Sequence, residues 1–236
     1  MAPDGGLRRV AEVSLRQIRA NLEVLAPQPE LVMIDLRANA YGHGLFPVAE
    51  LAAQAGVKSV FVSPRSDTDA LEEFGLRVMT PSSHGSSSAT LIGSELFGLA
   101  HNAHLPGCLR LVGDVVSVKR VHAGRGVSYG YTYRTREETT LALVALGFAD
   151  GVLRLASNRA PVLVGQTTGV ISGRIAMDQF VVDVSDARVR VGDEAVLFGN
   201  PEQGEPTVHD WAQVLDVHPA VITSRLGPRI ARCYLS

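Results

Sequence analysis

The sequence predicts an α/β region with too few strands to close a (β/α) barrel, over 1–108, followed by an antiparallel β domain over 109–236. Three observations predict this division. The first hundred residues alternate helical and strand-like segments, which is typical of a parallel sheet or of part of a (β/α) barrel. Short alternating segments separated by turns then take over, as in antiparallel β domains. A complete barrel needs roughly 250 residues, so the first region can hold only a fraction of one.

The α/β region opens with a helix and a buried strand. Apolar residues at Leu15, Ile18, Leu22 and Leu25 fall on one helical face. LVMIDL (31–36) has the pattern of a continuously apolar strand, as in a strand buried on both faces. The segments expected after it are a glycine-punctuated loop over 39–44, a helix over 47–56, a strand over 59–63, a helix over 68–75 and a strand over 76–80.

The composition of the chain changes at residue 81. PSSHGSSSAT (81–90) is rich in serine and glycine, which indicates a loop, and we expect one weak helical stretch between it and Pro106. The expected strands that follow are VVSVKRV, TTLALVAL, PVLVG, GVISGRI, QFVVDV and EAVLFG. The tail, 211–226, is expected to be helical in pieces.

Composition narrows the functional classes. The formal net charge of −2 over 236 residues gives no basic field that would favour nucleic acid or an anionic membrane. The longest apolar run, 141–149, is far shorter than the ~20 residues that span a bilayer. Two cysteines are too few for a disulfide framework, and a reduced pair is expected. We therefore expect a cytoplasmic protein whose partners are small molecules or other proteins.

Several motifs occur in one order along the chain. They are LVMIDLRANAYGHG (31–44), SSSATLIGSELFGL (86–99), GRGVSYGYTY (124–133), LGFADG (146–151), GRIAMDQFVVDV (173–184), VGDEAVLFG (191–199) and RLGPRIAR (225–232). In this order and spacing they resemble alanine racemase, a pyridoxal-phosphate-dependent family that interconverts L- and D-alanine. The resemblance covers residues from about 11 to 80 and from about 84 to the C-terminus.

The resemblance implies that the middle of the barrel is missing. The chain passes from the third strand directly to a segment similar to the one near the family's last barrel strand. The H-x-K-x-D-T-G-M-x-R-x-G motif of the family, whose histidine and arginine face the cofactor, has no counterpart here.

Arg37 stands where the family has the lysine that holds the cofactor as a Schiff base. A Schiff base needs an amine that can lose its proton, and a guanidinium stays protonated. The chain's other candidates are Lys58 and Lys119, its only lysines. Lys58 precedes an expected strand, at the end of a barrel where chemistry does not occur, and Lys119 lies in a β segment.

The resemblance assigns roles to five further residues. Tyr129 matches the tyrosine that acts as second base from the partner subunit, since racemisation moves a proton between the two faces of Cα. Tyr41 and Ser87 match positions that contact the cofactor phosphate. Met177 and Asp178 match a loop on the substrate side.

Two more departures weaken the implied site. Phe148 stands where the family has a tyrosine, so that a hydroxyl is lost. The arginine that donates to the pyridine nitrogen in the family is also missing, and His101 is the nearest polar residue.

Three hypotheses follow. The chain is an active minimal racemase, a non-catalytic subunit that pairs with an intact racemase and donates Tyr129, or an inactive product of an internal deletion. The site residues implied by the resemblance are Tyr129 and Arg37 for catalysis, Tyr41 and Ser87 for the cofactor, and Met177 and Asp178 for the substrate, with no metal. The family arrangement is a homodimer, and a heterodimer with an intact racemase is the alternative.

Overall fold

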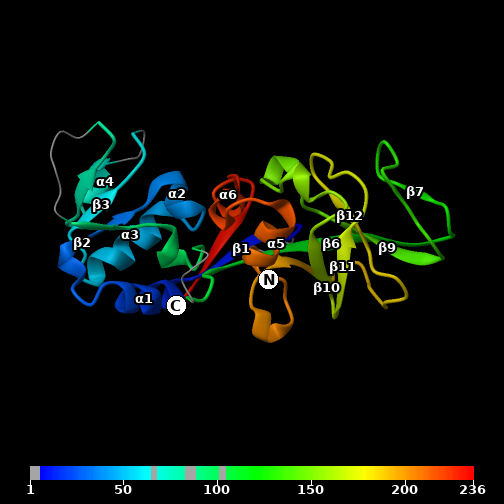
Figure 1. Cartoon of the computed structure of the whole chain (residues 1–236), viewed down its shortest axis with the longest axis horizontal. Coiled ribbons are helices and arrows are strands. Elements are labelled where there is room, and N and C mark those ends of the chain that lie inside the picture. The colour runs from blue at the N-terminus through cyan, green and yellow to red at the C-terminus, as the bar shows by residue number, and fades with distance from the viewer. Residues whose placement is uncertain (1–5, 65–67, 83–88, 101–104) are drawn as a thin grey trace. The chain divides into compact units, whose positions relative to one another are not determined.

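The structure is a computed structural model that describes residues 6–64, 68–82, 89–100 and 105–236. It divides into two compact units (Figure 1). The α/β unit comprises Val13–Cys108 and Tyr234–Ser236, and the β unit comprises Met1–Glu12 and Leu109–Cys233.

The α/β unit is built on a four-stranded parallel sheet. Its elements are α1 (Leu15–Leu25), η2 (Pro29–Leu31), β2 (Val32–Asp35), α2 (Arg37–Tyr41), α3 (Leu45–Gln54), β3 (Ser59–Phe61), α4 (Thr68–Glu72), β4 (Arg77–Met79), β5 (Thr90–Ile92) and η3 (Ser94–Phe97). The strands lie in the order β4-β3-β2-β5, and all pairings are parallel. The expected parallel sheet is therefore confirmed, with β2 at its centre.

Burial follows the two faces of this sheet. Ile34 of β2 pairs with Val60 of β3 and with Ile92 of β5, and all three side chains are buried. Ile18 and Leu22 of α1 are also buried, as the helical pattern predicts. On the other face of β5, Leu91 is exposed.

The segment before Pro106 contains a weak helical stretch, as expected, in the 3₁₀ helix η3, but it also contains the strand β5, which was not expected. Its β-branched residues Thr90 and Ile92 favour a strand, and the parallel pairing with β2 supplies hydrogen bonds that a helix would have to make internally.

The β unit is built on an eight-stranded sheet. Its elements are β1 (Arg9–Ser14), β6 (Leu109–Val121), β7 (Gly126–Val127), β8 (Tyr133–Arg134), β9 (Thr139–Val144), η4 (Phe148–Asp150), η5 (Arg154–Ala156), β10 (Pro161–Val164), β11 (Thr167–Ile171), β12 (Phe180–Asp183), β13 (Glu194–Phe198), η6 (Pro201–Gln203), α5 (Val208–Leu215), α6 (Pro219–Thr223) and β14 (Ala231–Leu235), of which β1 and β14 continue into the α/β unit. The strand order is β13-β10-β11-β12-β9-β6-β1-β14. All six expected strand segments are confirmed, and the tail is helical in two pieces.

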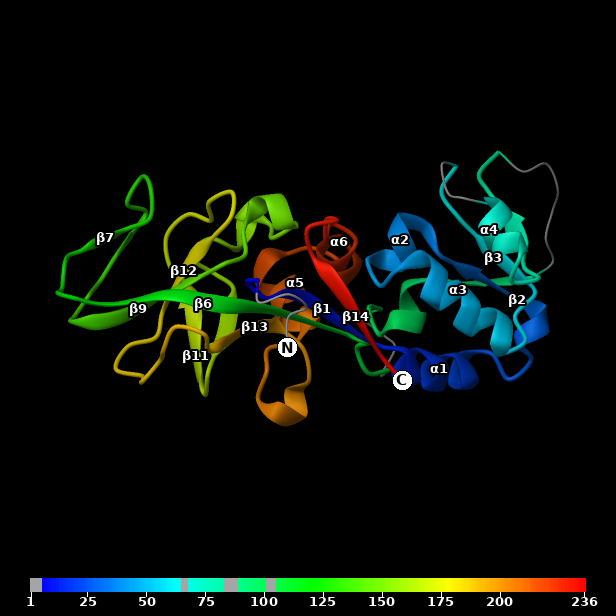
Figure 2. The same cartoon turned by 180° about the vertical axis from the view of Figure 1, so that it is seen from behind.

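An additional pairing closes part of this sheet. β6 pairs with β9 and also with β13, so β13, β10, β11, β12, β9 and β6 form a continuous ring. β6 is 13 residues long, which lets it meet β13 with one half and β9 with the other. In Figures 1 and 2 the β7–β8 pair lies beyond the ends of β6 and β9.

Trp211 of α5 packs against the closed ring of strands in the β unit. Its indole contacts the aromatic side chain of Phe198 in β13 edge-on, with centroids 5.9 Å apart, and its indole N–H donates to the carbonyl of Pro161 at 2.9 Å. Trp211 is 1% exposed. The indole therefore buries its apolar surface and still satisfies its one donor.

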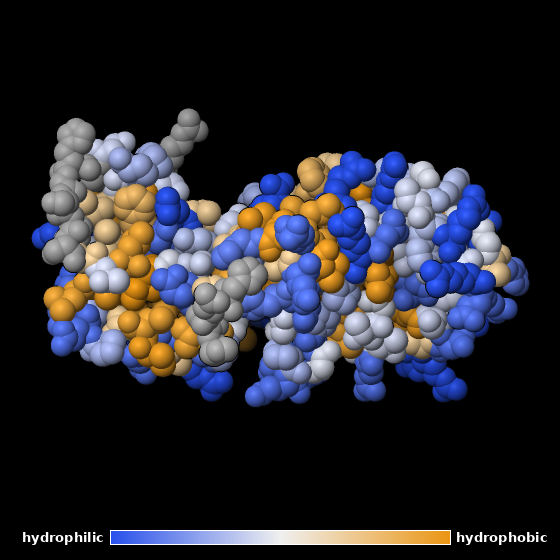
Figure 3. Space-filling view, viewed as in Figure 1, coloured by the Kyte–Doolittle hydropathy of each residue, from blue (hydrophilic) through white to orange (hydrophobic). Residues whose placement is uncertain are grey.

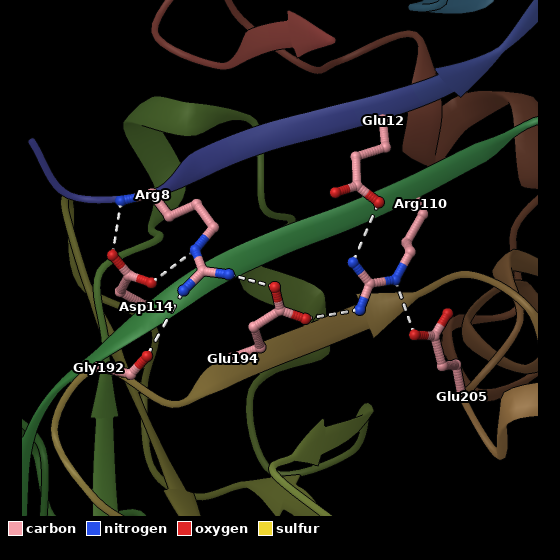
Figure 4. Close-up of polar contacts among 7 residues, drawn as sticks. All are labelled: Arg8, Glu12, Arg110, Asp114, Gly192, Glu194 and Glu205. Atoms are coloured by element: carbon pink, nitrogen blue, oxygen red, sulfur yellow. Dashed lines mark hydrogen bonds and ion pairs between the residues drawn. The ribbon is translucent and has the colours of Figure 1, made fainter. Parts of the chain in front are cut away.

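A partly buried charged network joins β1, β6 and β13 in the β unit (Figure 4). Arg110 contacts Glu205 at 2.7 Å, Glu194 at 2.8 Å and Glu12 at 3.1 Å. Glu194 also contacts Arg8, which reaches Asp114 at 2.9 Å. Each arginine thus connects carboxylates from different strands.

Two sequence expectations concern features other than the sheets. Cys108 and Cys233 are both free thiols, as expected. Within the ranges that the structure describes, every helix is too short or too polar to cross a membrane.

Candidate functional site

The turn after β2 has an unusual backbone. Ala38, Asn39, Ala40 and Tyr41 all have positive φ, between 51° and 58°, so α2 is a left-handed turn. This conformation costs roughly 1–2 kcal/mol per L-residue. Such strain persists only where surrounding contacts outweigh it, and it is concentrated at functional positions.

Hydrogen bonds hold the left-handed turn in place. The backbone N–H of Ala40 donates to Leu36, and the N–H of Gly44 donates to Asn39. The side-chain oxygen of Asn39 accepts from the N–H of Leu45, at the start of α3. The turn is therefore tied to the strand before it and to the helix after it.

Arg37 is held by a carboxylate at the end of β2. Its Nε lies 3.0 Å from Oδ1 of Asp35, and one terminal nitrogen lies 2.6 Å from Oδ2. The side chain of Asp35 is 2% exposed and that of Arg37 is 48% exposed. The Arg37 guanidinium also lies over the ring of Phe61, 4.9 Å from its centroid.

Tyr41 completes the cluster around Asp35. Its hydroxyl donates to Oδ2 of Asp35 at 2.8 Å. Burial and this hydrogen bond raise the pKa of Tyr41. The Tyr41 ring packs on Phe97 of η3, with centroids 5.6 Å apart, and His43 stacks on the same ring at 4.4 Å.

Asp35 is charged in this cluster. Burial by itself would raise the pKa of Asp35, but hydrogen bonds from Arg37 and Tyr41 outweigh it and lower the pKa overall. The same contact raises the pKa of Arg37. The structure therefore brings two of the predicted residues, Arg37 and Tyr41, together around a carboxylate that the sequence analysis did not single out.

In the β unit, Tyr129 lies against the loop that precedes Met177. Its hydroxyl donates to the carbonyl of Ile175 at 3.1 Å. The guanidinium groups of Arg154 and Arg174 lie 5.6 Å and 5.7 Å from its ring centroid. Tyr129 is nevertheless 46% exposed, so a large part of it faces solvent.

Asp178 is fixed by an arginine from the last motif. Arg229 contacts Asp178 at 2.6 Å and the fully buried Asp150 at 3.1 Å. The backbone N–H of Ala149 donates to the carbonyl of Met177 at 2.9 Å. A Cβ at Gly147 would collide with that carbonyl, so only glycine allows this approach.

The remaining predicted residues have different environments. Met177 and Phe148 are exposed, and so are Lys58 and Lys119. Ser87 and His101 lie outside the described residues. Within the described ranges, no group of three or more His, Cys, Asp or Glu side chains could hold a metal ion.

Sequence reasoning missed several members of these clusters. Asp35 was part of a strand interpreted as continuously apolar, and the signal was a carboxylate at the end of an otherwise apolar run. Arg229 lies in RLGPRIAR, a motif that was noted without assigning a role to its arginines. Arg174 likewise lies in a motif, GRIAMDQFVVDV, that was noted without assigning a role to its arginine, whereas Arg154 lies in none of the motifs, because its contact with Tyr129 joins distant segments.

The fold places the chain in a class of two-unit proteins, with a parallel α/β sheet in one unit and a β domain in the other. The family model described as "Alanine racemase, C-terminal domain" matches residues 108–234. The chain belongs to the alanine racemase family, a family of isomerases.

Individual relatives support this assignment. An alanine racemase from Thermobifida fusca is 52% identical over 126 residues, which are 53% of this chain and 34% of that protein. One from Frankia casuarinae is 42% identical over 204 residues, which are 86% of this chain and 48% of that protein. The chain thus spans less than half the length of these two curated relatives.

Solved structures agree on the fold. Alanine racemase from Streptomyces lavendulae matches with a TM-score of 0.81 and 26% identity, over 99% of this chain and 98% of that one. A Bartonella henselae alanine racemase described as carrying covalently bound pyridoxal phosphate matches with a TM-score of 0.78, over 97% of this chain and 99% of that one. At 19% identity, the second likeness concerns the fold alone.

Proposed function

We propose that this chain is a shortened alanine racemase that no longer forms the Schiff base with pyridoxal phosphate. The observation that carries the proposal is the contact of Arg37 with Asp35, 2.6 Å at its shortest, directly after β2. At the position that corresponds to the family's lysine, a guanidinium with a pKa above ~12 has no reactive lone pair. A buried carboxylate holds it as a cation.

The residues present do not fit a covalently held cofactor. Lys58 and Lys119 are exposed; Lys58 precedes β3, whereas the turn follows the neighbouring parallel strand β2, and Lys119 belongs to β6 of the β unit. Asp35 balances the charge of Arg37 and also accepts a hydrogen bond from the hydroxyl of Tyr41. The cluster therefore offers a phosphate no uncompensated cation, and we derive no step of racemisation through the cofactor.

The domain assignment belongs to this proposal. We take 1–108 as an incomplete (β/α) barrel and 109–236 as the C-terminal β domain of the family. The four parallel strands of the α/β unit are half of the eight that close a barrel. The shortened match to the curated relatives is consistent with loss of the barrel's middle.

A second function is favoured by the environment of Tyr129. In this alternative the chain pairs with an intact racemase and donates Tyr129 to the partner's site, where L- or D-alanine is the substrate. Tyr129 is half exposed, and Arg154 and Arg174 flank its ring. The Tyr129 hydroxyl donates to the carbonyl of Ile175, two residues before Met177.

Reduction with borohydride in the presence of pyridoxal phosphate tests the first function. We expect no stoichiometric adduct by mass spectrometry, because neither lysine is in a position to react selectively. A stoichiometric adduct at Lys58 or Lys119, lost in the corresponding Lys→Arg variant, would contradict the proposal. An intact racemase treated in parallel is the positive control.

Co-purification with a full-length racemase tests the alternative. A subunit that donates Tyr129 should form a complex whose racemase activity falls in Tyr129→Phe while the complex itself remains. If no complex forms, or if activity is the same with Tyr129→Phe, the partner function is wrong.

A further inference from the structure

We infer that Asp35 is a second determinant, beside Arg37, that excludes amine chemistry from the turn after β2. The inference rests on the proposed function and deepens it. A lysine restored at position 37 would not be a reactive amine, because Asp35 would hold it as an ammonium ion.

The orientation of Asp35 does not depend on the guanidinium alone. Its Oδ1 accepts the backbone N–H of Arg37 at 3.0 Å, and its Oδ2 accepts the hydroxyl of Tyr41 at 2.8 Å. Both donors remain when the side chain at position 37 is changed. The carboxylate therefore stays aimed at that side chain.

The left-handed turn fixes the distance between these groups. Position 37 is bounded by β2 on one side and by the strained residues Ala38–Tyr41 on the other. The turn brings Tyr41 back onto Asp35, two residues before position 37. A lysine at position 37 would begin its side chain within reach of an anion that is 2% exposed.

Glu95 adds a second carboxylate to the surroundings. A Cβ built on Gly93 would lie 3.1 Å from the Tyr41 hydroxyl, 3.6 Å from a Glu95 oxygen and 3.8 Å from the Cβ of Asp35. In the part of the chain that the structure describes, the titratable groups found near position 37 are Asp35, Tyr41 and Glu95. Asp35 is the one in contact with the side chain at position 37.

A nearby anion affects the reaction of an amine with an aldehyde because it changes how much of the amine is protonated. A neutral amine attacks the aldehyde carbon, a C=N bond replaces C=O, and the oxygen leaves as water with both amine hydrogens. An ammonium ion has no lone pair and must first release a proton to solvent. An opposite charge in contact favours the protonated form and raises the amine pKa, so the reactive fraction falls about tenfold per pKa unit.

The decisive experiment compares R37K with R37K/D35N. Each protein is incubated with pyridoxal phosphate between pH 6 and 10, reduced with borohydride and digested. Labelling at position 37 is normalised to Lys119 in the same molecule. We expect at least about tenfold more labelling at pH 7.5 in the double variant, and in R37K a rise only toward high pH.

A matched control removes the other carboxylate. R37K/E95Q loses the charge of Glu95, which lies beside Tyr41, and should label as weakly as R37K. Equal labelling of R37K and R37K/D35N at pH 7.5 would overturn the inference. Equal gains from D35N and E95Q would also overturn it, because a general field would then be acting instead of the contact.

A second measurement does not require replacing Asp35. In R37K, the pKa of the introduced lysine can be measured by NMR from its side-chain nitrogen. We expect a value above the ordinary ~10.4, and a value below it would overturn the inference. Wild-type chain, which has no lysine at position 37, tests the proposed function separately, since a stoichiometric adduct there would arise at Lys58 or Lys119.

Discussion

The two units differ in whether their sheets contain a closed ring of strands, although the eight-stranded sheet also has an open end at β14, which pairs with β1 alone among the described strands. In the β unit, the pairing of β6 with both β9 and β13 returns six strands on themselves, so these strands have neighbours on both sides. In the α/β unit, β4 and β5 each have one neighbour among the described strands. Closure removes strand edges, which otherwise present backbone donors and acceptors to solvent or to other chains.

Surface composition does not separate the two units in the same way. Figure 3 shows apolar surface on both, and the exposed apolar side chains include Leu31 and Leu91 in the α/β unit and Leu155 and Val191 in the β unit. The β unit carries the charged network of Arg8 and Arg110 across three of its strands (Figure 4). The part of the chain that matches the family model is also the part that contains the closed ring of strands.

The largest expected effect comes from opening the charged network of the β unit. Arg110→Ala would leave Glu205, whose side chain is 3% exposed, without its cation. Removing one partner of such a buried pair costs about 3 kcal/mol or more. Urea unfolding followed by Trp211 fluorescence measures the loss.

Arg120 provides the matched control for this change. It pairs with two carboxylates, Glu138 and Asp186, where Arg110 pairs with three, and the side chains of Arg120 and of both its partners are largely exposed. Exposed pairs contribute little, so Arg120→Ala should leave the unfolding midpoint unchanged. Equal losses in the two variants would show that burial of Glu205 is not the cause.

Hydrogen exchange compares the units within one molecule. Amides of β3 and β4, which are three residues long and lie at or near a sheet edge, should exchange about a hundredfold faster than those of β6 and β9. Local opening free energies range from near zero up to the global value, and short edge strands belong to the low end. Mass spectrometry of peptic fragments provides the measurement.

The β7–β8 pair tests the explanation within the β unit. Its strands have two residues each and lie outside the closed ring. If closure determines protection, this pair should exchange as fast as β3 and β4. Uniform protection across both units would contradict the comparison.

Local patterns predicted most of the elements, whereas long-range contacts decided what the sequence analysis missed. The apolar face of α1 and the alternation in β9–β13 depend on neighbours in the sequence, and both were predicted. The ring depends on β13 meeting β6, about 80 residues earlier in the chain. No local pattern marks such a pairing.

The candidate site shows the same limit. The replacement at Arg37 is visible in the sequence, because a motif surrounds it. The left-handed turn is not, because Ala38, Ala40 and Tyr41 individually favour right-handed conformations. The Asp35 cluster could be found only after that turn had brought Tyr41 back to the end of β2.

Acid should weaken both units, through different carboxyls. In the β unit, burial would raise the pKa of Glu194, but the hydrogen bond and the charge attraction to Arg110 lower that pKa overall. In the α/β unit, the pKa of Asp35 is lowered. A lowered folded-state pKa stabilises the fold above the unfolded value, about 4 for carboxyls, and the contribution is lost as pH falls through the folded value.

Glu194→Gln separates the two contributions. It should flatten the decline of β-unit stability below about pH 4, followed by Trp211 fluorescence. The acid response of β2 in hydrogen exchange should remain as in the wild type, because Asp35 is unchanged. A variant whose Trp211 signal declines with acid as steeply as that of the wild type would remove Glu194 as the cause.

The smallest effects concern helix caps, one in each unit. Thr207 and Asp210 form a reciprocal capping box at α5, with N–H···O distances of 3.0 Å and 2.7 Å. Ser14 caps α1 through a single hydrogen bond from the backbone N–H of Gln17, at 3.1 Å. Thr207→Ala should cost about 1 kcal/mol and Ser14→Ala about half as much.

Two measurements separate these substitutions. Because α5 carries Trp211, only Thr207→Ala should shift the unfolding midpoint detected by fluorescence, whereas Ser14→Ala should speed hydrogen exchange in α1 alone. A shift of both signals by either substitution would mean that the units unfold together, and the contrast between a closed and an open sheet would then have no thermodynamic consequence.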